Sequence, residues 1–365
     1  MGLNKILNQK RAKQHLLMAL KSGRLPNAFL FSGPRGVGKT TTALILARIL
    51  DCERMEFDSC DSCQSCERAH RFQHPEIEFV FPIPSWSKDD TGDESKRAAL
   101  RWSVLSKKIE SPLSFVAFDQ KTSISINEIR LLSRASSTRI LHGKWRVFIV
   151  SRAEKMTPDA QNAFLKLLEE PRENTLIILV TSKPHLLLPT VLSRCQEVKF
   201  GGLPEQHIRD ALVEWLSVPA EKAQIIASLS QGSLGRALEL TEEAAFEERR
   251  AAVEFLTRSL SNEIAPLVGD MERISYERDY SFVERLVENL LLFHMDVLSF
   301  QNGGEKDFFA NKDMIDLIKA ESERTSFKET RRRVAIFLKA LEAVDRNVDP
   351  GLILHEVSYQ LGTHH

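Results

Sequence analysis

The stretch Gly33-Pro34-Arg35-Gly36-Val37-Gly38-Lys39-Thr40 decides the fold of this chain. It fits G-x-x-x-x-G-K-[ST], a loop whose backbone N–H groups surround phosphate groups at the start of a helix. The apolar run 28–31 before it predicts a buried strand, and helical spacing over residues 41–50 predicts the helix after it. This context favours a phosphate-binding loop over a glycine turn that only caps a helix.

The loop predicts a nucleotide ligand, ATP or ADP with Mg²⁺. Lys39 would reach the terminal phosphates, and the Thr40 hydroxyl would ligate the cation. The candidate nucleotide-binding residues of this stretch are Gly33, Pro34, Arg35, Gly36, Val37, Gly38, Lys39, Thr40 and Thr41.

The composition is that of a soluble globular protein of two or three domains, with 365 residues, 42% of them hydrophobic and 27% charged. The apolar runs are too short to span a bilayer, and the N-terminal residues lack a signal-peptide core, so we expect a cytoplasmic protein without membrane contact. Lys plus Arg and Asp plus Glu number 50 each. No overall positive charge draws the chain to nucleic acid, so any DNA contact requires a local patch or a partner.

Four of the five cysteines lie within residues 52–66, at Cys52, Cys60, Cys63 and Cys66. Two consecutive C-x-x-C steps together with Cys52 can provide four thiolates for a tetrahedral Zn²⁺, a closed site with a structural role. The alternative is a set of reduced, partly buried thiols. A redox role is disfavoured because the surrounding sequence lacks a thioredoxin-like context.

Alternating apolar strands and amphipathic helices up to about residue 202 predict a parallel sheet covered on both faces. Residues 82–124 interrupt this pattern as an insertion. Within it, Ala98, Trp102, Leu105 and Ile109 form a helical stripe, which we expect to pack on its own domain rather than on DNA or a partner.

From residue 203 onward the pattern is helical. Two stripes predict a helical bundle core. The first contains Val283, Leu286, Val287, Leu290 and Leu291, and the second contains Val334, Phe337, Leu338 and Leu341.

Several stretches together resemble the subunits of the bacterial DNA polymerase III clamp loader, which are AAA+ proteins. They are Ser22-Gly23-Arg24-Leu25-Pro26, the phosphate loop, the four-cysteine segment, Ala160-Gln161-Asn162-Ala163-Phe164-Leu165-Lys166-Leu167-Leu168-Glu169-Glu170-Pro171, and Leu192-Ser193-Arg194-Cys195. His74-Pro75-Glu76 is similar to a segment of the delta-prime type of subunit, whereas gamma/tau subunits differ there.

The resemblance implies an α/β AAA+ P-loop domain over residues 1–202, with a zinc module at about 52–66 and the insertion at about 82–124. It also implies a helical lid domain over 203–243 and an all-α collar domain over 244–365. The implied partners are gamma/tau and delta subunits in a heteropentamer. Through that complex the chain would meet the sliding clamp and primer-template DNA.

The catalytic positions depart from an active ATPase of this type. The strand at 147–150 should be followed by Asp-Glu, which hold Mg²⁺ and orient the attacking water. Ser151-Arg152 stands there instead, and arginine stays protonated and cannot act as a base. Glu154 lies three residues past the aspartate position, and we do not expect it to replace that residue.

The sensing positions are partly retained. Active family members carry an arginine after the glycine-serine-leucine turn, where this chain has Gly235, and we expect the neighbouring Arg236 to point elsewhere. Thr181 or Ser182 occupies the sensor position after the fourth strand, so Thr181 joins the candidate nucleotide-binding residues.

Arg194 is by resemblance an arginine finger that acts in trans on ATP held by the adjacent subunit. The alternative is a surface arginine in an ordinary ion pair. The leading hypothesis is therefore a delta-prime-like subunit that binds nucleotide without hydrolysing it and lends Arg194 to a gamma/tau neighbour. The alternatives are a gamma/tau-like ATPase with an unusual metal site and a nucleotide-free scaffold subunit.

Overall fold

The computed structural model describes residues 3, 6–84, 94–110, 122–260, 279–305, 309–346 and 348–362, which divide into two compact units. Unit 1 contains the described residues up to His207 together with Ser233–Gly235, and unit 2 contains the other described residues from Ile208 onward. The division into three domains, with lid and collar meeting at about residue 243, stays a prediction.

Unit 1 is built on a five-stranded sheet with the order β2-β5-β6-β1-β7, in which every neighbouring pair is parallel. The strands are β1 Ala28–Ser32, β2 Ile77–Val80, β5 Arg146–Ser151, β6 Thr175–Thr181 and β7 Gln196–Lys199. All residues of β1 and β6 are buried. This arrangement confirms the predicted parallel sheet, and it brings the carboxyl ends of β1, β5 and β6 to one edge.

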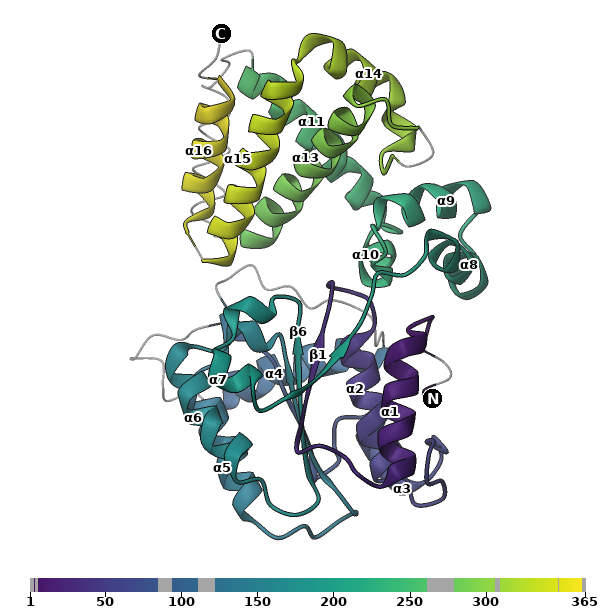
Figure 1. Ribbon diagram of the computed structural model, residues 1–365, viewed down its shortest axis with the longest axis vertical. Coiled ribbons are helices and arrows are strands. Elements are labelled where there is room, and N and C mark those ends of the chain that lie inside the picture. The colour runs from purple at the N-terminus through teal and green to yellow at the C-terminus, as the bar shows by residue number, and fades with distance from the viewer. Residues whose placement is uncertain are drawn as a thin grey trace. The chain divides into compact units, whose positions relative to one another are not determined.

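Helices cover both faces of this sheet (Figure 1). On one side lie α1 Lys10–Ser22 and α2 Lys39–Leu50, and on the other lie α5 Ile126–Ser137, α6 Pro158–Glu169 and α7 Pro189–Leu192. The core between the sheet and the second set includes Phe148, Leu179 and Phe164, all fully buried. Helix α6 begins where expected, because Thr157 accepts a hydrogen bond from the Ala160 N–H at 3.2 Å.

Unit 1 also contains three short helical elements. They are α3 Gln64–His70 in the cysteine segment, the 3₁₀ turn η3 Ala153–Lys155 after β5, and the 3₁₀ turn η4 Pro184–Leu186 after β6.

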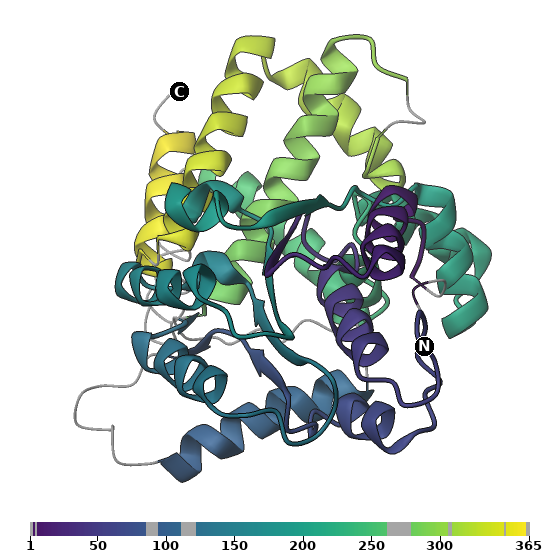
Figure 2. The ribbon, with the colours of Figure 1, turned by 60° about the horizontal axis from the view of Figure 1, so that its bottom comes forward.

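The predicted insertion is closed by a second, two-stranded antiparallel sheet of β3 Ile83–Pro84 and β4 Thr122–Ser123. Between them lies α4 Glu94–Glu110, the blue helix of Figure 2, while 85–93 and 111–121 fall outside the described residues. Because the two strands pair, the insertion leaves and rejoins the chain at one place.

Helix α4 packs on its own unit as expected, but not through the whole predicted stripe. Val104 is buried, and Arg101 pairs with Glu128 at 2.5 Å and lies over the Phe81 ring. Ala98 is exposed and Trp102 is 48% exposed. That part of the prediction is wrong, since the helix meets its unit through Val104 and Arg101 rather than through Ala98 and Trp102.

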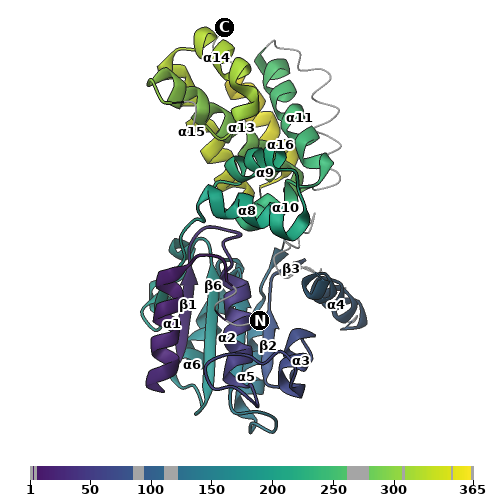
Figure 3. The ribbon, with the colours of Figure 1, turned by 90° about the vertical axis from the view of Figure 1, so that its right-hand side faces the viewer.

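Unit 2 is entirely helical in its described residues (Figure 3). Its elements, including the parts of α8 and α10 shared with unit 1, are α8 Glu205–Leu216, α9 Ala220–Leu229, α10 Leu234–Glu239, α11 Glu243–Leu260, α13 Tyr280–Gln301, η6 Lys312–Met314, α14 Ile315–Arg324, α15 Phe327–Asp345 and α16 Pro350–Gly362.

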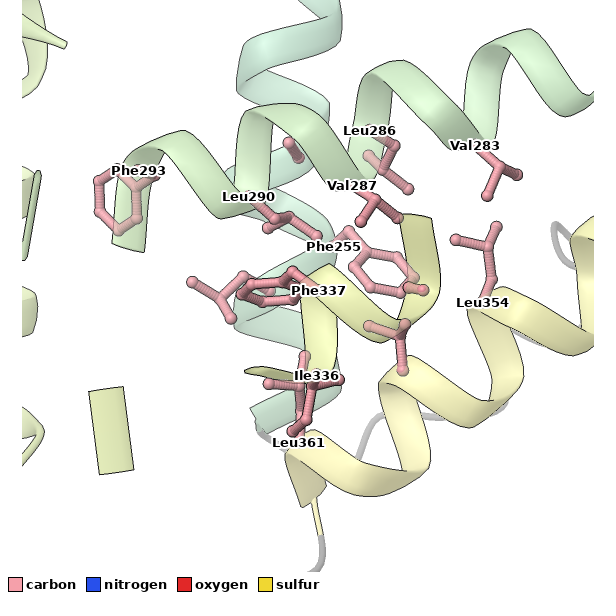
Figure 4. Close-up of a cluster of buried hydrophobic side chains, with 14 of the residues drawn as sticks. Phe255, Val283, Leu286, Val287, Leu290, Phe293, Ile336, Phe337, Leu354 and Leu361 are labelled. Atoms are coloured by element: carbon pink, nitrogen blue, oxygen red, sulfur yellow. The ribbon is translucent and has the colours of Figure 1, made fainter. Parts of the chain in front are cut away.

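The core of unit 2 joins α11, α13, α15 and α16 (Figure 4). The first predicted stripe is confirmed, with Val283, Leu286, Val287 and Leu290 buried. In the second, Phe337 is buried but Leu338 is 49% exposed, and Ile336 takes its place in the core. Among the described residues, no helix has both the length and the apolar character needed to cross a membrane.

Candidate functional site

The phosphate loop connects β1 to α2 and depends on its glycines. Gly33 and Gly36 have φ of 138° and 75°, a region that L side chains rarely adopt. A Cβ at Gly33 would lie 2.1 Å from the Phe200 carbonyl oxygen, and one at Gly36 would lie 2.1 Å from the Ser233 Oγ. The positive φ at both positions and the close approach of the Phe200 backbone at Gly33 therefore favour glycine, which supports the loop prediction.

Lys39 is the buried cation of this loop, with 6% of its surface exposed. Its Nζ donates hydrogen bonds to the carbonyl oxygens of Gly33 at 2.7 Å and Pro34 at 2.5 Å. Burial lowers the pKa of Lys39 to about 8, while the negative charge of Glu154 acts in the opposite direction. The ammonium group is thus held at the loop by carbonyl oxygens that a phosphate would have to replace.

Thr40 and Ser151 face each other where an aspartate is expected in an active ATPase. Their Oγ atoms lie 3.5 Å apart. The residue after β5, Arg152, has φ 52° and ψ 51° and begins the η3 turn. The position beside the threonine hydroxyl therefore carries a neutral oxygen in place of a carboxylate.

The two candidate sensor residues have different contacts. Thr181 is buried in β6, and its Oγ1 accepts a hydrogen bond from the Lys183 N–H at 3.0 Å. The Ser182 hydroxyl donates to Glu154 Oε1 at 3.2 Å. Ser182 is therefore the residue that touches a carboxylate near the loop.

The turn predicted to have lost its arginine lies against the phosphate loop. The Gly235 N–H donates to the Gly36 carbonyl oxygen at 3.0 Å, an approach that a residue without a side chain permits. The guanidinium of Arg236 bonds Glu288 at 2.7 Å and Asn289 at 3.2 Å within unit 2. Thr41 lies in the first turn of α2.

Gln9 contacts the phosphate loop, a contact that the sequence did not reveal. Its side-chain amide donates to the carbonyl oxygens of Val37 at 3.3 Å and Gly201 at 2.7 Å, and its carbonyl accepts from the Gly201 N–H. It therefore ties the phosphate loop to the segment after β7. A single glutamine ahead of a helix carries no pattern that could have identified this contact.

The four cysteines meet as predicted. Their sulfur atoms all lie within 4.8 Å of one another, and all four are free thiols. Tetrahedral Zn–S bonds of about 2.3 Å place sulfurs about 3.8 Å apart, so the cluster fits such an ion with small adjustments. Backbone N–H groups of Cys60, Cys63 and Cys66 point at sulfur atoms of the preceding cysteines at 3.3–3.4 Å. The cluster could hold a metal ion.

The thiols would not all ionise without a cation. Burial and the neighbouring sulfurs raise the pKa of Cys66, whereas hydrogen bonding from the Ser62 N–H lowers that of Cys60 to about 6. Four adjacent thiolates repel one another, so all four could ionise together only with a cation bound among them.

The segment His74-Pro75-Glu76 connects the cysteine segment to the sheet. Glu76 binds the buried Arg146 guanidinium, with Nε at 2.8 Å, and accepts from the Leu141 N–H at 2.9 Å. The His74 ring meets the Ser65 hydroxyl at 3.2 Å, beside Cys66. Although burial opposes it, these donors hold the pKa of Glu76 below its usual value. The segment that suggested the delta-prime type has a structural role in this chain.

Arg194 lies just after α7 on the surface of unit 1. Its Nη2 bonds Glu169 of α6 at 2.7 Å, and its Nη1 donates to the Thr190 carbonyl oxygen at 3.0 Å. The two side chains are 36% and 48% exposed. In the single chain Arg194 thus forms the surface ion pair that was the alternative to an arginine finger.

Comparison with known proteins identifies the family. The sequence model of the family described as "DNA polymerase III, delta subunit" matches residues 8–204. The chain belongs to this family. The DNA polymerase III subunit delta' of Bacillus subtilis is 28% identical over 352 residues, which cover 96% of this chain and 95% of that protein. The resemblance to clamp-loader subunits of the delta-prime type is confirmed.

Two further relatives are more distant. The tau subunit of Bacillus subtilis DNA polymerase III is 28% identical over 244 residues, 66% of this chain and 37% of that protein. The crystal structure of a gamma subunit-related protein from Thermotoga maritima superposes with a TM-score of 0.44 at 15% identity, covering 96% of this chain and 98% of that one. That structural likeness is too low to add to the sequence match.

Proposed function

We propose that this chain acts as a delta-prime-type AAA+ subunit of the DNA polymerase III clamp loader and binds nucleotide without hydrolysing it. The observation that carries the second part is the Thr40–Ser151 pair, 3.5 Å between hydroxyl oxygens. Mg²⁺ favours carboxylate ligands, and the water that attacks the γ-phosphate needs an acceptor for its proton. Ser151 and Arg152 provide neither.

Arg194 is the group that we expect to serve a neighbour's ATP. A guanidinium beside the transferred phosphoryl group accelerates related reactions by about 10³- to 10⁵-fold. The pair with Glu169 does not oppose this role, because an exposed ion pair contributes only about 0–1 kcal/mol. Replacement of Glu169 by a phosphate would therefore cost little.

The other parts of the proposal follow from the relatives. The gamma/tau and delta subunits would be partners in a heteropentamer that places the sliding clamp on primer-template DNA, with the helices after residue 244 as the collar. The cysteine cluster would hold one Zn²⁺ with a structural role, since four sulfur ligands leave no open position for water.

A steady-state ATPase assay tests the proposal, with the purified chain beside its Lys39→Ala variant. We expect no Lys39-dependent turnover. Turnover of about 1 s⁻¹ or faster that disappears in the variant is a typical enzyme rate and would identify a gamma/tau-like ATPase instead.

A nucleotide-free scaffold is the second candidate, and one observation favours it. The Lys39 ammonium already bonds two carbonyl oxygens of its own loop. Equilibrium dialysis with labelled ATP separates the two. Saturable ATP binding that Lys39→Ala removes supports the nucleotide site. Absence of binding at about millimolar nucleotide supports the scaffold, because binding with a free energy of about 4 kcal/mol or more would be detected at that concentration.

A further inference from the structure

Glu154 lies on a turn that backbone hydrogen bonds hold in place. It lies on the η3 turn, which begins directly after β5 with the left-handed Arg152 and packs the fully buried Ala153 inward. The strand that ends the insertion holds the other side of this turn. The Ile124 N–H donates to the Lys155 carbonyl oxygen at 2.9 Å, and the Thr157 N–H donates to that of Ile124 at 3.1 Å.

The carboxylate of Glu154 is only half satisfied. Oε1 accepts the hydrogen bond from Ser182, whereas Oε2 is buried and has no hydrogen-bond partner among the described residues. Buried carboxylate oxygens are normally paired, since a charge removed from water without a partner is costly. The buried oxygen therefore lacks the donor or cation that would normally compensate its charge, among the described residues.

This carboxylate lies on a turn that leaves the sheet at the same edge as the phosphate loop, and its charge acts on Lys39 of that loop. Ser151 and Thr181 end the neighbouring parallel strands β5 and β6, so the turns that carry Glu154 and Ser182 leave the sheet at one edge. The Thr40 hydroxyl lies at that edge beside Ser151, and the charge of Glu154 acts on the buried Lys39 ammonium. The site has lost the carboxylate of residue 151 but has another from three residues further along.

We propose that Glu154, oriented by Ser182, is the acidic residue through which this site takes a nucleotide together with a divalent cation. Its carboxylate would supply the negative charge that a hydrated divalent cation requires. The proposal departs from the expectation that Glu154 does not replace the missing aspartate. It does so for binding alone, because Arg152 still occupies the position of the water-orienting glutamate. The inference rests on the proposed nucleotide binding.

The test measures ADP affinity of the full chain by equilibrium dialysis, in Mg²⁺ and in EDTA, so that hydrolysis plays no part. In the unmodified chain we expect Mg²⁺ to strengthen binding by about tenfold or more, which equals about 1.4 kcal/mol. In Glu154→Gln the ratio should fall to about twofold or less. Binding in EDTA should stay equal or improve, because a negative charge near the phosphates has been removed.

Three further variants complete the comparison. Glu154→Asp keeps the charge and should retain part of the Mg²⁺ ratio, and Ser182→Ala should lower it. The exposed Glu173→Gln is the matched control and should leave it unchanged. An unchanged Mg²⁺ ratio in Glu154→Gln, or no Mg²⁺ effect in the unmodified chain, overturns this inference alone. Absence of ADP binding under both conditions overturns it together with the proposed nucleotide site.

Discussion

His294 in the core of unit 2 should make the stability of this unit depend on pH. The ring is fully buried on α13 between Phe293 and Phe337, with centroids 5.6 and 5.0 Å away. Nδ1 lies 2.9 Å from the Leu290 carbonyl oxygen, and Nε2 has no hydrogen-bond partner among the described residues. Burial lowers the pKa of His294 from 6.5 to about 4, although the Leu290 carbonyl favours the charged form.

The sign follows from proton uptake. Between pH 6.5 and about pH 4 the unfolded chain binds a proton at this residue and the folded chain does not. Stability is therefore complete above the unfolded value and decreases as the pH falls towards the folded value. At about 1.4 kcal/mol per pKa unit, the full loss amounts to about 3.5 kcal/mol, of which about 2.5 kcal/mol has occurred by pH 4.5.

Amide hydrogen exchange of α13 measures this loss within unit 2, after correction for the intrinsic exchange rate. His294→Phe fills the aromatic site without a titrating group and should remove most of the pH dependence between about pH 7 and 4.5. His355→Ala, at an exposed position of α16, is the control and should behave like the unmodified chain. If His294→Phe keeps the full pH dependence, the ring is not the group responsible and the reasoning from burial is wrong.

Three further predictions concern the other sites. Metal analysis should find one zinc per chain, and replacing Cys63 and Cys66 by serine should remove it; full retention in that variant contradicts a four-cysteine site. Arg194→Ala should slow ATP hydrolysis by the loader reconstituted with gamma/tau and delta but leave assembly intact, and an unchanged rate argues against the finger. Thr157→Ala should cost about 1 kcal/mol in urea unfolding, since it removes the cap of α6, and a loss below about 0.3 kcal/mol shows that the cap contributes little.

Local patterns predicted much of the fold because they reflect local physics. The apolar run before the phosphate loop became the fully buried strand β1 of a parallel sheet. Two C-x-x-C steps and the preceding Cys52 predicted the cluster in which all four sulfur atoms meet. The stripe around Val283 became the bundle core.

The sequence alone determined that this chain has a phosphate loop, a cysteine cluster and no carboxylates at positions 151 and 152. Only the tertiary structure decided which distant groups meet them. Gln9 reaches the loop, Arg194 lies on Glu169, and the η3 turn carries Glu154 to Ser182. These contacts join residues far apart in the chain, and they depend on strand order and turn geometry that no short pattern encodes. For that reason Glu154, set aside from its position in the sequence, became the carboxylate that we propose for the site.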